Sequence, residues 1–536
     1  MDSKWIWWKH GVIYQIYPRS FYDSNGDGIG DIPGIIEKLD YLKDLGIDAI
    51  WLSPVNTSPM HDFGYDISNY RDIDEIFGSK KDFRELIKEA HLRDIKIIMD
   101  MVVNHTSHMH QWFIESRSSL DNPKRDWYIW RDGKNGKPPN NWIAAFGGSS
   151  WEKDAHTGQY YLHSFLKEQP DVNWRNKELR EAMYNEMRYW LDRGVDGFRL
   201  DVVNWFMKDE NFRNNTLSLR PQQLQKHRYD RNRPESHEIM KEIRQVVDSY
   251  KDRMLVGEVF SLPPGDPKLS ASYIGDGTDE LHMAFDFSMI YKRWNARTVY
   301  RTIARWMEII PENGWPCHVL SNHDQPRSIS RFGGGSDAIK RARVAATLLL
   351  TLKGTPFIYY GEEIGMRNIS ISRKDIQDPL GKRYWPLYTG RDPARAPMQW
   401  SSEENAGFTR GTVWLPVHRN YRRVNVETDA ADKYSMLNHY KSLIRIRKKK
   451  KALHMGDWTP LIKGVDSIIA YTRECEEQKI FVVLNFSNGV RKLTLNDRGQ
   501  WRVISSTHKF VNEHFTDIDF KVMPYEATIV QRIGAL

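Results

Sequence analysis

Short, almost continuously apolar runs alternate with helix-like periodicity over the first two-thirds of the chain. Near-continuous apolar character is typical of strands buried on both faces, as in a parallel sheet. Between the first two runs, apolar residues recur at helical spacing from Ile35 to Leu45, and Gly46 follows as a natural helix end. The runs that we interpret as strands are 11–17, 49–53, 95–103, 197–203, 254–260, 283–287, 318–324 and 356–363.

This alternation predicts an α/β fold, a (β/α)8 (TIM) barrel, with a doubly wound parallel sheet as the alternative. Two long, poorly periodic segments interrupt the pattern, one after the third strand and one after the eighth. From about residue 455, short strand-like runs separated by turn residues predict a small antiparallel β domain. The expected domains are 1–104, the first part of the barrel; 105–174, an inserted lobe; 175–450, the rest of the barrel with an excursion at 366–430; and 451–536, a C-terminal β-sandwich.

The amino-acid composition predicts a globular chain without a nucleic-acid partner. Of its 536 residues, 40% are apolar and 28% are charged, which excludes disordered and collagen-like architectures. The surplus of 78 basic over 70 acidic residues is spread thinly along the chain. The one concentration, within 445–451, follows an apolar-periodic stretch, and we interpret it as a solvated helix end, with a polyanion-binding site as the less favoured alternative.

Neither cysteine spacing nor hydropathy indicates an exported or membrane protein. Cys317 and Cys475 are too few and too far apart for a disulfide framework or a cysteine metal site. The first residues lack the pattern of a cleavable leader, and no run of about 18 apolar residues is present. We therefore expect a cytoplasmic location and no membrane partner, while the oligomeric state stays open.

Polar side chains follow several predicted strands at the point where each strand ends. In a barrel these ends share one face, the face that carries active sites. Three acids placed there, Asp201, Glu258 and Asp324, suit cleavage of a glycosidic bond, which needs a proton donor and a second carboxylate. Repulsion among them keeps one acid protonated near neutral pH. From spacing alone, unrelated helix caps remain the alternative, and Arg199 could orient Asp201 or form an ordinary salt bridge.

Several ordered motifs resemble those of one enzyme family. The segments 100–105 (DMVVNH), 197–201 (GFRLD), 257–259 (GEV) and 321–324 (SNHD) are similar to the four motifs of the α-amylase family, glycoside hydrolase family 13. The resemblance extends over roughly residues 5 to 450, and the β domain fits the family's usual C-terminal module.

The resemblance implies a role for each residue within these motifs. Asp201 would be the nucleophile, Glu258 the acid/base, and Asp324 the carboxylate that binds and distorts the sugar. His105 and His323 would hydrogen-bond sugar hydroxyls. These roles correspond to a retaining double displacement.

Further motifs resemble the α-glucosidases of the oligo-1,6-glucosidase type within this family. They are QPDVN at 169–173, DFGYD at 62–66 and RAPMQW at 395–400, where Ala396 replaces the usual threonine. By resemblance, Asp62, Tyr65 and Arg395 would line a closed pocket for one terminal glucose. Phe146 and Phe165 would wall that pocket. Val202, directly after the nucleophile, slightly favours α-1,6 over α-1,4 linkages.

The segment 23–31 has the D-x-N-x-D-G opening of a calcium loop. Gly34 stands where an EF-hand supplies a bidentate carboxylate, so this is not an EF-hand. We expect a structural Ca²⁺ remote from the chemistry, with a metal-free turn rich in Asp and Asn as the alternative. The expected ligands are Asp23, Asn25, Asp27, the main-chain carbonyl of Ile29, and Asp31.

Together these features predict a glycoside hydrolase: a retaining, exo-acting α-glucosidase whose partner is a short α-linked oligosaccharide. A transglucosylase or isomerase of the sucrose isomerase or trehalose synthase type would use the same residues, but the RLDRD segment of sucrose isomerases is missing after Arg327. A phosphosugar hydrolase would need an added cationic clamp. A non-catalytic barrel, such as a transporter heavy-chain ectodomain, would lack the acids and carry a membrane anchor.

Overall fold

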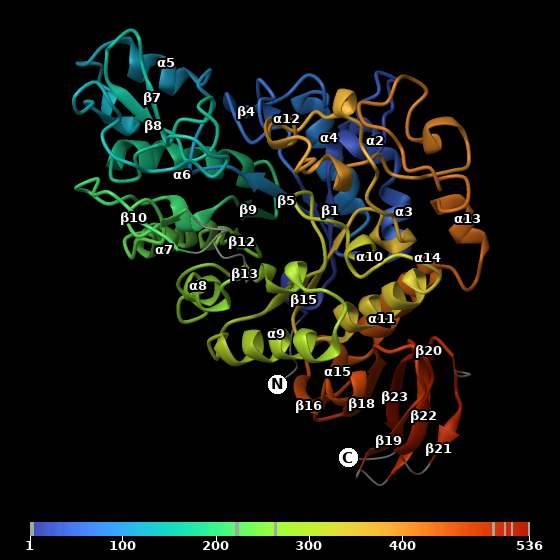
Figure 1. The fold of residues 1–536 in the computed structure, drawn as a ribbon. Helices are drawn as coiled ribbons and strands as arrows, with labels where there is room; N and C mark the ends of the chain where they lie inside the picture. The colour runs from blue at the N-terminus through green and yellow to red at the C-terminus, as the bar shows by residue number, and fades with distance from the viewer. Residues whose placement is uncertain are drawn as a thin grey trace.

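The computed structural model of the chain describes residues 5–219, 224–261, 265–495, 499–508, 511–515 and 518–533. Figure 1 shows a barrel flanked by an inserted lobe at one end and a β domain at the other. None of the described helices combines the length and the apolar character that crossing a bilayer requires.

Eight parallel strands form one sheet, which confirms the predicted barrel. Each strand except the sixth pairs with the next of the eight, and the last pairs back with the first. In the described part of the chain, the ladder is open only between β13 and β14. Every strand lies within one residue of a predicted run. The strands are β1 (Ile13–Ile16), β2 (Ala49–Leu52), β5 (Lys96–Met101), β9 (Gly197–Leu200), β12 (Met254–Glu258), β13 (Met283–Phe285), β14 (Cys317–Val319) and β15 (Thr355–Tyr359).

Alternate side chains of these strands point into the barrel, where large apolar residues form a core. The register sets Asp100 of β5 beside Arg199 of β9, and Arg199 beside Val256 of β12. Asp201 and Glu258 lie two residues beyond Arg199 and Val256. Because side chains alternate with a period of two, both acids point toward the same end of the barrel interior.

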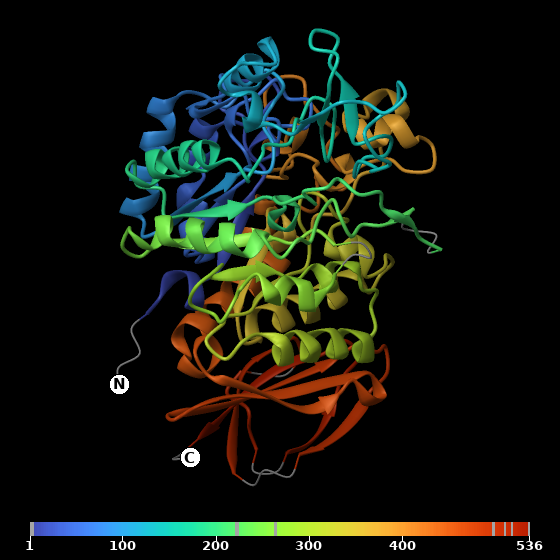
Figure 2. The ribbon, with the colours of Figure 1, turned by 90° about the vertical axis from the view of Figure 1, so that its left-hand side faces the viewer.

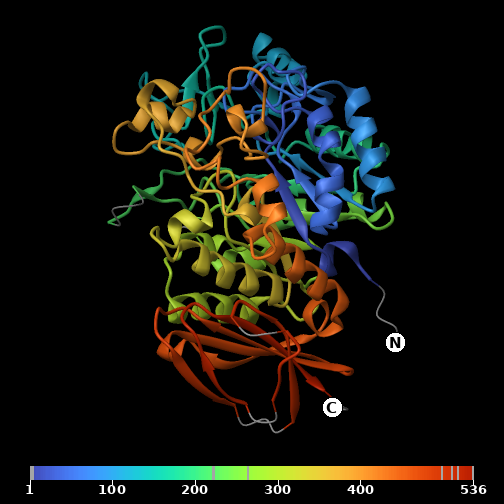
Figure 3. The same ribbon diagram turned by 90° about the vertical axis from the view of Figure 1, so that its right-hand side faces the viewer.

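Helices cover the outside of the sheet, as Figures 2 and 3 show from opposite sides. The helical residues between the first two strands form two helices, and Gly46, with φ of 92°, ends the second one. The main helices are α2 (Ile32–Glu37), α3 (Leu39–Leu45), α4 (Lys80–Leu92), α6 (Lys177–Leu191), α7 (Ser236–Asp248), α8 (Pro267–Ser272), α9 (Ala296–Ile309), α11 (Ala338–Thr351) and α14 (Met436–Lys449).

Two long excursions rise above the carboxyl ends of the strands. After β5, the chain forms helix α5 (Gln111–Ser118) and a small antiparallel sheet of β6 (Trp130–Arg131), β8 (Tyr160–Leu162) and β7 (Trp151–Lys153). After β15, it forms α12 (Pro379–Tyr384) and α13 (Val426–Ala431). Figures 2 and 3 both show these excursions side by side. The exact domain boundaries stay predictions.

The C-terminal part is antiparallel, as predicted. A six-stranded sheet has the order β16-β17-β18-β23-β20-β21, and β19 pairs with β22. The sequence pattern missed the edge strand β16 and the short β21 and β22. The strands are β16 (Asp457–Lys463), β17 (Ile468–Cys475), β18 (Gln478–Asn485), β19 (Arg491–Leu495), β20 (Gln500–Ser506), β21 (His514–Phe515), β22 (Ile518–Val522) and β23 (Ala527–Ile533).

The prediction of a solvated helix end at 445–451 is wrong for Arg447. Its side chain is fully buried and donates hydrogen bonds to main-chain carbonyls of Leu350, Leu352 and Gly354, at and beyond the end of α11. The negative end of that helix therefore binds a cation from the end of its neighbour, α14. Lys448 forms an ion pair of 2.9 Å with Asp48.

Candidate active site

A pocket of about 210 Å³ opens at the carboxyl ends of the barrel strands. It collects side chains from strand ends, from the inserted lobe and from the excursion after β15, including all three predicted catalytic acids. The lining residues are Asp62, Tyr65, His105, Ala145, Phe146, Phe165, Gln169, Asp201, Val202, Glu258, Phe260, Asp324, Gln325, Leu380, Tyr388 and Arg391.

Arg199 ties the acids at the floor of this pocket together. Its Nη1 lies 2.8 Å from Asp201 Oδ1 and 2.8 Å from Asp100 Oδ1, and its Nη2 contacts Glu258 Oε2. Arg199 is fully buried, whereas Asp201 and Glu258 are 6% and 5% exposed. The guanidinium therefore fixes two carboxylates from neighbouring strands with their open sides toward the pocket.

Glu258 is the acid whose environment favours the protonated form. Burial raises its pKa well above the usual glutamate range, and the negative charges of Asp201 and Asp324 raise it further, against the opposing charge of Arg199. A carboxyl group that keeps its proton near neutral pH is suited to be a general acid.

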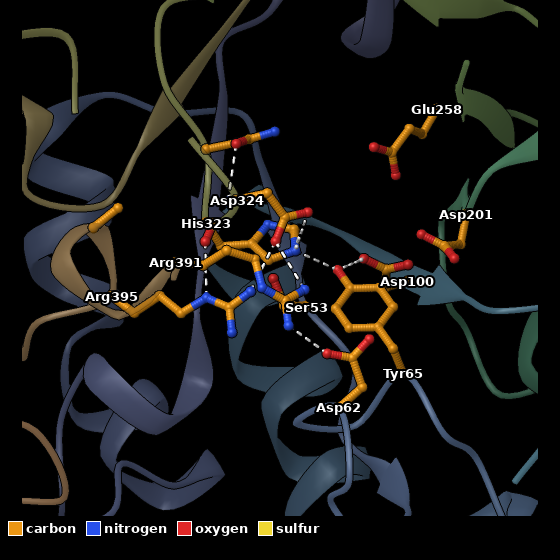
Figure 4. Close-up of polar contacts among 12 residues, drawn as sticks. Ser53, Asp62, Tyr65, Asp100, Asp201, Glu258, His323, Asp324, Arg391 and Arg395 are labelled. Carbon is orange, nitrogen blue, oxygen red and sulfur yellow. Dashed lines mark hydrogen bonds and ion pairs between the residues drawn. The ribbon is translucent and has the colours of Figure 1, made fainter. Parts of the chain in front are cut away.

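Asp324 has the opposite environment. Burial alone would raise its pKa, but nearby positive charges hold it below its usual range. Burial lowers the pKa of His323 to about 3, so this imidazole is neutral and the positive charge comes from arginines. Arg395 Nη2 lies 2.7 Å and Arg391 Nη1 3.5 Å from Asp324 Oδ1. Asp324 is therefore a permanent anion facing Glu258 across the pocket (Figure 4).

Arg391 also anchors a second carboxylate of the pocket. Its Nη2 lies 2.6 Å from Asp62 Oδ1 and 2.8 Å from Asp378 Oδ1. Burial raises the pKa of Asp62, and the charge of Arg391 opposes this rise. One guanidinium thus connects the end of the pocket near Asp62 with Asp324, as Figure 4 shows.

Tyr65 stacks on His323 with the two rings nearly parallel and their centroids 5.4 Å apart. Its hydroxyl lies 2.7 Å from His323 Nε2 and donates to Asp100 Oδ2 at 3.0 Å. The other ring nitrogen of His323 lies 2.8 Å from Gln15 Nε2. This network holds one flat face of the Tyr65 ring at the pocket wall.

The inserted lobe supplies the opposite wall. Gln169 Nε2 lies 3.1 Å from His105 Nε2 and 3.4 Å from Asp62 Oδ2. Phe165 packs against His105 at 5.2 Å between centroids, and Phe146 packs edge-on against Phe165 at 5.6 Å. Aromatic rings in such a wall offer apolar faces to the C–H groups of a sugar.

Val202 is strained and lines the pocket. Its φ of 40° lies in the left-handed region, where β-branched residues are rare because their side chain crowds the backbone. Such strain costs about 1–3 kcal/mol and persists only where surrounding packing imposes it. The turn directly after Asp201 is therefore held in place by its neighbours.

The predicted site residues fall into two layers. Asp62, Tyr65, His105, Phe146 and Phe165 line the pocket with the three acids.

Arg199, His323 and Arg395 instead lie behind the pocket surface, with exposed fractions of 0%, 0% and 1%. They contact the acids or Tyr65 and hold them in place.

The sequence reasoning did not select Arg391, Phe260, Tyr388 and Leu380, which also line the pocket. Only Arg391 had a signal that could have been used, because it precedes Arg395 by one helical turn in the same Pro-containing segment. Leu380 lies in the short helix α12, while Phe260 follows β12 and Tyr388 follows α12 in segments without periodicity, and nothing in one sequence marks these three.

The 23–31 loop is wound around Asp23, whose carboxylate accepts hydrogen bonds from the N–H groups of Gly26 and Gly28, each at 2.7 Å. Asp31 caps α2 by accepting a hydrogen bond of 2.6 Å from Gly34 N–H. Among the residues that the structure describes, no group of three His, Cys, Asp or Glu side chains is close enough to hold a metal ion. In this conformation the side-chain oxygens of Asp23, Asn25 and Asp27 accept hydrogen bonds from the loop's own backbone, and the calcium site stays a prediction.

Known proteins resemble this chain over nearly its full length. A family model described as the alpha amylase catalytic domain matches residues 15–456. The chain is 43% identical to an oligo-1,6-glucosidase of Parageobacillus thermoglucosidasius, over 98% of both chains. Two solved structures, each 38% identical, are also similar. An alpha-glucosyl transfer enzyme has a TM-score of 0.92 and covers 99% of this chain and 100% of its own. The isomaltulose synthase of Protaminobacter rubrum has a TM-score of 0.91, with coverage of 98% and 99%.

Proposed function

Because the chain belongs to the alpha-amylase catalytic-domain family, we propose that it is a retaining α-glucosidase that removes terminal non-reducing glucose from short oligosaccharides. One observation carries the proposal. A single buried arginine, Arg199, holds Asp201 and Glu258 side by side at the floor of a pocket that contains a third acid, Asp324.

The two carboxyl groups perform a double displacement. An oxygen of Asp201 attacks the anomeric carbon as the glycosidic C–O bond breaks, and Glu258 gives its proton to the departing oxygen. Glu258 then takes a proton from water, whose oxygen attacks the same carbon and releases Asp201. Two inversions leave the freed glucose in its original α configuration.

The pocket's far end supports exo action. Asp62 and Arg391 form a buried ion pair there, and Gln169 lies against Asp62. A terminal glucose presents hydroxyl groups that hydrogen-bond such charged partners, whereas an internal sugar needs an open path for the chain on both sides.

The linkage proposal rests on Val202 and on relatives. Val202 lines the pocket beside Asp201 and presents an apolar surface. The relative from Parageobacillus thermoglucosidasius is called an oligo-1,6-glucosidase. We therefore favour α-1,6 linkages slightly over α-1,4 linkages.

Sucrose isomerisation is the second candidate, because the solved structures similar to this chain include an isomaltulose synthase. Such an enzyme would use the same acids and differ in how far it excludes water. A phosphosugar hydrolase is less consistent with the site. Arg391 is the one cation among the described residues that line the pocket, and three carboxylates surround it.

One product chromatogram tests these candidates together. Purified protein is incubated separately with isomaltose, maltose, sucrose and trehalose. We expect free glucose from isomaltose and, more slowly, from maltose. Rearranged sucrose isomers as the main product would establish the isomerase, and no conversion of any of the four would refute the glucosidase.

We propose in addition that the 23–31 loop binds one Ca²⁺ ion. The proposal rests on the D-x-N-x-D-G spacing of oxygen ligands and on the burial of Asp23 and Asp31, whose negative charges a bound cation would balance. Differential scanning fluorimetry tests this with calcium, with magnesium and with a chelator. Calcium should raise the unfolding temperature of the wild type and not of Asp27→Asn. Equal curves in calcium and chelator would establish the metal-free turn.

A small α-linked oligosaccharide is the expected partner, and the cytoplasmic location stays a prediction. Cell fractionation followed by an activity assay tests the location. Activity in the exported fraction would contradict it.

A further inference from the structure

The short helix α12, in the excursion after β15, lies beside the pocket and contacts the inserted lobe. Leu380 of α12 and Tyr388, just beyond it, line the pocket, and so does Phe146 of the inserted lobe. The distance between α12 and the lobe therefore sets how much of a substrate beyond the first glucose fits at the entrance.

The first end of α12 is anchored to the charged residues of the pocket. Asp378 caps this helix by accepting a hydrogen bond from Leu380 N–H, and it forms an ion pair with Arg391. Arg391 in turn binds Asp62 and Asp324. Because every member of this chain of ion pairs is mostly buried, the start of α12 moves only if the pocket itself deforms.

The last turn of α12 is bound to the inserted lobe. Arg383 Nη1 donates to the carbonyl of Gly147 at 3.0 Å, and the Tyr384 hydroxyl donates to the carbonyl of Phe146 at 2.9 Å. Arg391 adds a third link, because its guanidinium lies 5.3 Å from the centroid of the Phe146 ring. The helix is thus fastened to both walls of the entrance.

The lobe is shaped to receive this helix. Gly147 and Gly148 both have positive φ angles, 88° and 85°. A Cβ atom on Gly147 would collide with the Tyr384 hydroxyl, the far end of an exposed side chain, which would have to move away from the lobe.

We propose that Arg383 and Tyr384 are specificity-determining residues that hold the inserted lobe against α12 and so restrict the entrance to short substrates. The inference rests on the proposed glucosidase function. It adds that substrate length is selected by two hydrogen bonds to the main chain, remote from the reacting atoms.

The test compares kcat/KM for the disaccharide and the tetrasaccharide of the linkage series that the wild type cleaves. In Arg383→Gln combined with Tyr384→Phe, we expect the tetrasaccharide-to-disaccharide ratio to rise roughly three- to tenfold, the range that loss of one or two net hydrogen bonds produces. Because the longer substrate gains access when the restriction is removed, the change should come from a lower KM for the tetrasaccharide with kcat nearly unchanged. Lys382→Gln, on an exposed part of the same helix, is the matched control.

Two results would overturn the inference: an unchanged ratio, or an equal loss on both substrates together with a lower unfolding temperature, which indicates a structural role only. A wild type that cleaves neither series would instead refute the glucosidase proposal.

A pair of glycine variants probes the same contact from the lobe. Gly147→Ala and Gly158→Ala, both in the inserted lobe, replace glycines with similar positive φ angles, but only the first places a methyl group against Tyr384, because a Cβ atom on Gly158 meets nothing within 4 Å. We expect Gly147→Ala to reproduce the shift in the ratio and Gly158→Ala to leave the ratio unchanged. Equal shifts would attribute the effect to strain and contradict the proposal.

Discussion

Barrel strands carry one wall of the pocket, and the segment that follows the last strand carries a second wall beside the inserted lobe. Asp201 and Glu258 are placed by strand register and by the period of two, so their positions follow from backbone geometry. Arg391 and Tyr388 lie in a segment without strands, where ion pairs and helix caps set the side-chain positions. The two walls face each other across the site (Figure 4).

This difference indicates that one wall carries out the reaction and the other selects the substrate. The strand-borne wall holds the groups that make and break bonds, on a rigid frame that many sequences can build. The loop-borne wall closes the pocket and decides which substrate enters it. Changes in the first wall should therefore abolish turnover, whereas changes in the second should alter binding and preference.

The largest effect is expected at the first wall. Asp201→Asn should lower kcat by roughly 10⁴-fold or more, because no other group forms the covalent intermediate. Asp196→Asn is the matched control, since Asp196 precedes the same strand at the opposite end and binds His91 there at 2.6 Å. The control should lower the unfolding temperature and retain turnover. Comparable kcat values in the two variants would refute the assignment of the nucleophile.

The next effect is expected at the second wall. Arg391→Lys keeps the charge but loses the planar fork that reaches several carboxylates, and breaking a buried pair costs about 3–5 kcal/mol. We expect kcat/KM to fall about 10²- to 10³-fold, mainly through KM. Arg419→Lys, an exposed site in the same excursion, should have no effect. A fall confined to kcat would place Arg391 among the groups that act on the transition state.

The pH dependence of kcat/KM tests the raised pKa of Glu258. Glu258 must be protonated to act first, and its raised pKa extends this form to higher pH. The kcat/KM profile should therefore fall on its alkaline side at a pH above the usual glutamate range. A fall centred near pH 4 would contradict the raised pKa.

The same shift has a stability consequence. Because the folded protein holds the Glu258 proton more tightly than the unfolded chain, this group stabilises the fold at low pH and loses that contribution as pH rises through its folded pKa. Glu258→Gln removes the titration. The unfolding temperature of the variant minus that of the wild type should therefore increase as pH rises above about 4, the pKa of the unfolded group. A constant difference at all pH values would argue against the shift.

The smallest effect is expected at Val202. Val202→Thr keeps the branched shape and replaces one methyl group by a hydroxyl. The isomaltose-to-maltose rate ratio should move toward maltose by less than about tenfold, the scale of one group in a pocket. An unchanged ratio would end the linkage inference.

Most of the barrel could be predicted because its strands are buried on both faces and read as continuous apolar runs. Strand β16 could not, because every second residue is exposed and it contains Pro460, which a single sequence marks as non-strand. The structure places it at a sheet edge, where proline is tolerated. The prediction for Arg447 was wrong for a related reason. The sequence does not distinguish an arginine that binds buried carbonyl groups from one that is exposed to solvent.

The same limit applies within the site. The residues behind the acids were found because they lie inside motifs or at a strand period from Asp201. Arg391 and Tyr388 were not found. They lie in a long segment that has no strand pairing, so the sequence does not indicate which residues are their neighbours in space. The position of Arg391 depends on a contact with Asp62, which lies more than 300 positions earlier in the chain.

Proton NMR of isomaltose cleavage, recorded from the first minute, tests the central claim most directly. With Asp201 as nucleophile and Glu258 as acid and then base, the α-anomer of glucose must accumulate first and convert to the β-anomer only by mutarotation. Initial release of β-glucose would show that water attacks the anomeric carbon directly, and the roles assigned to the two carboxylates would be wrong.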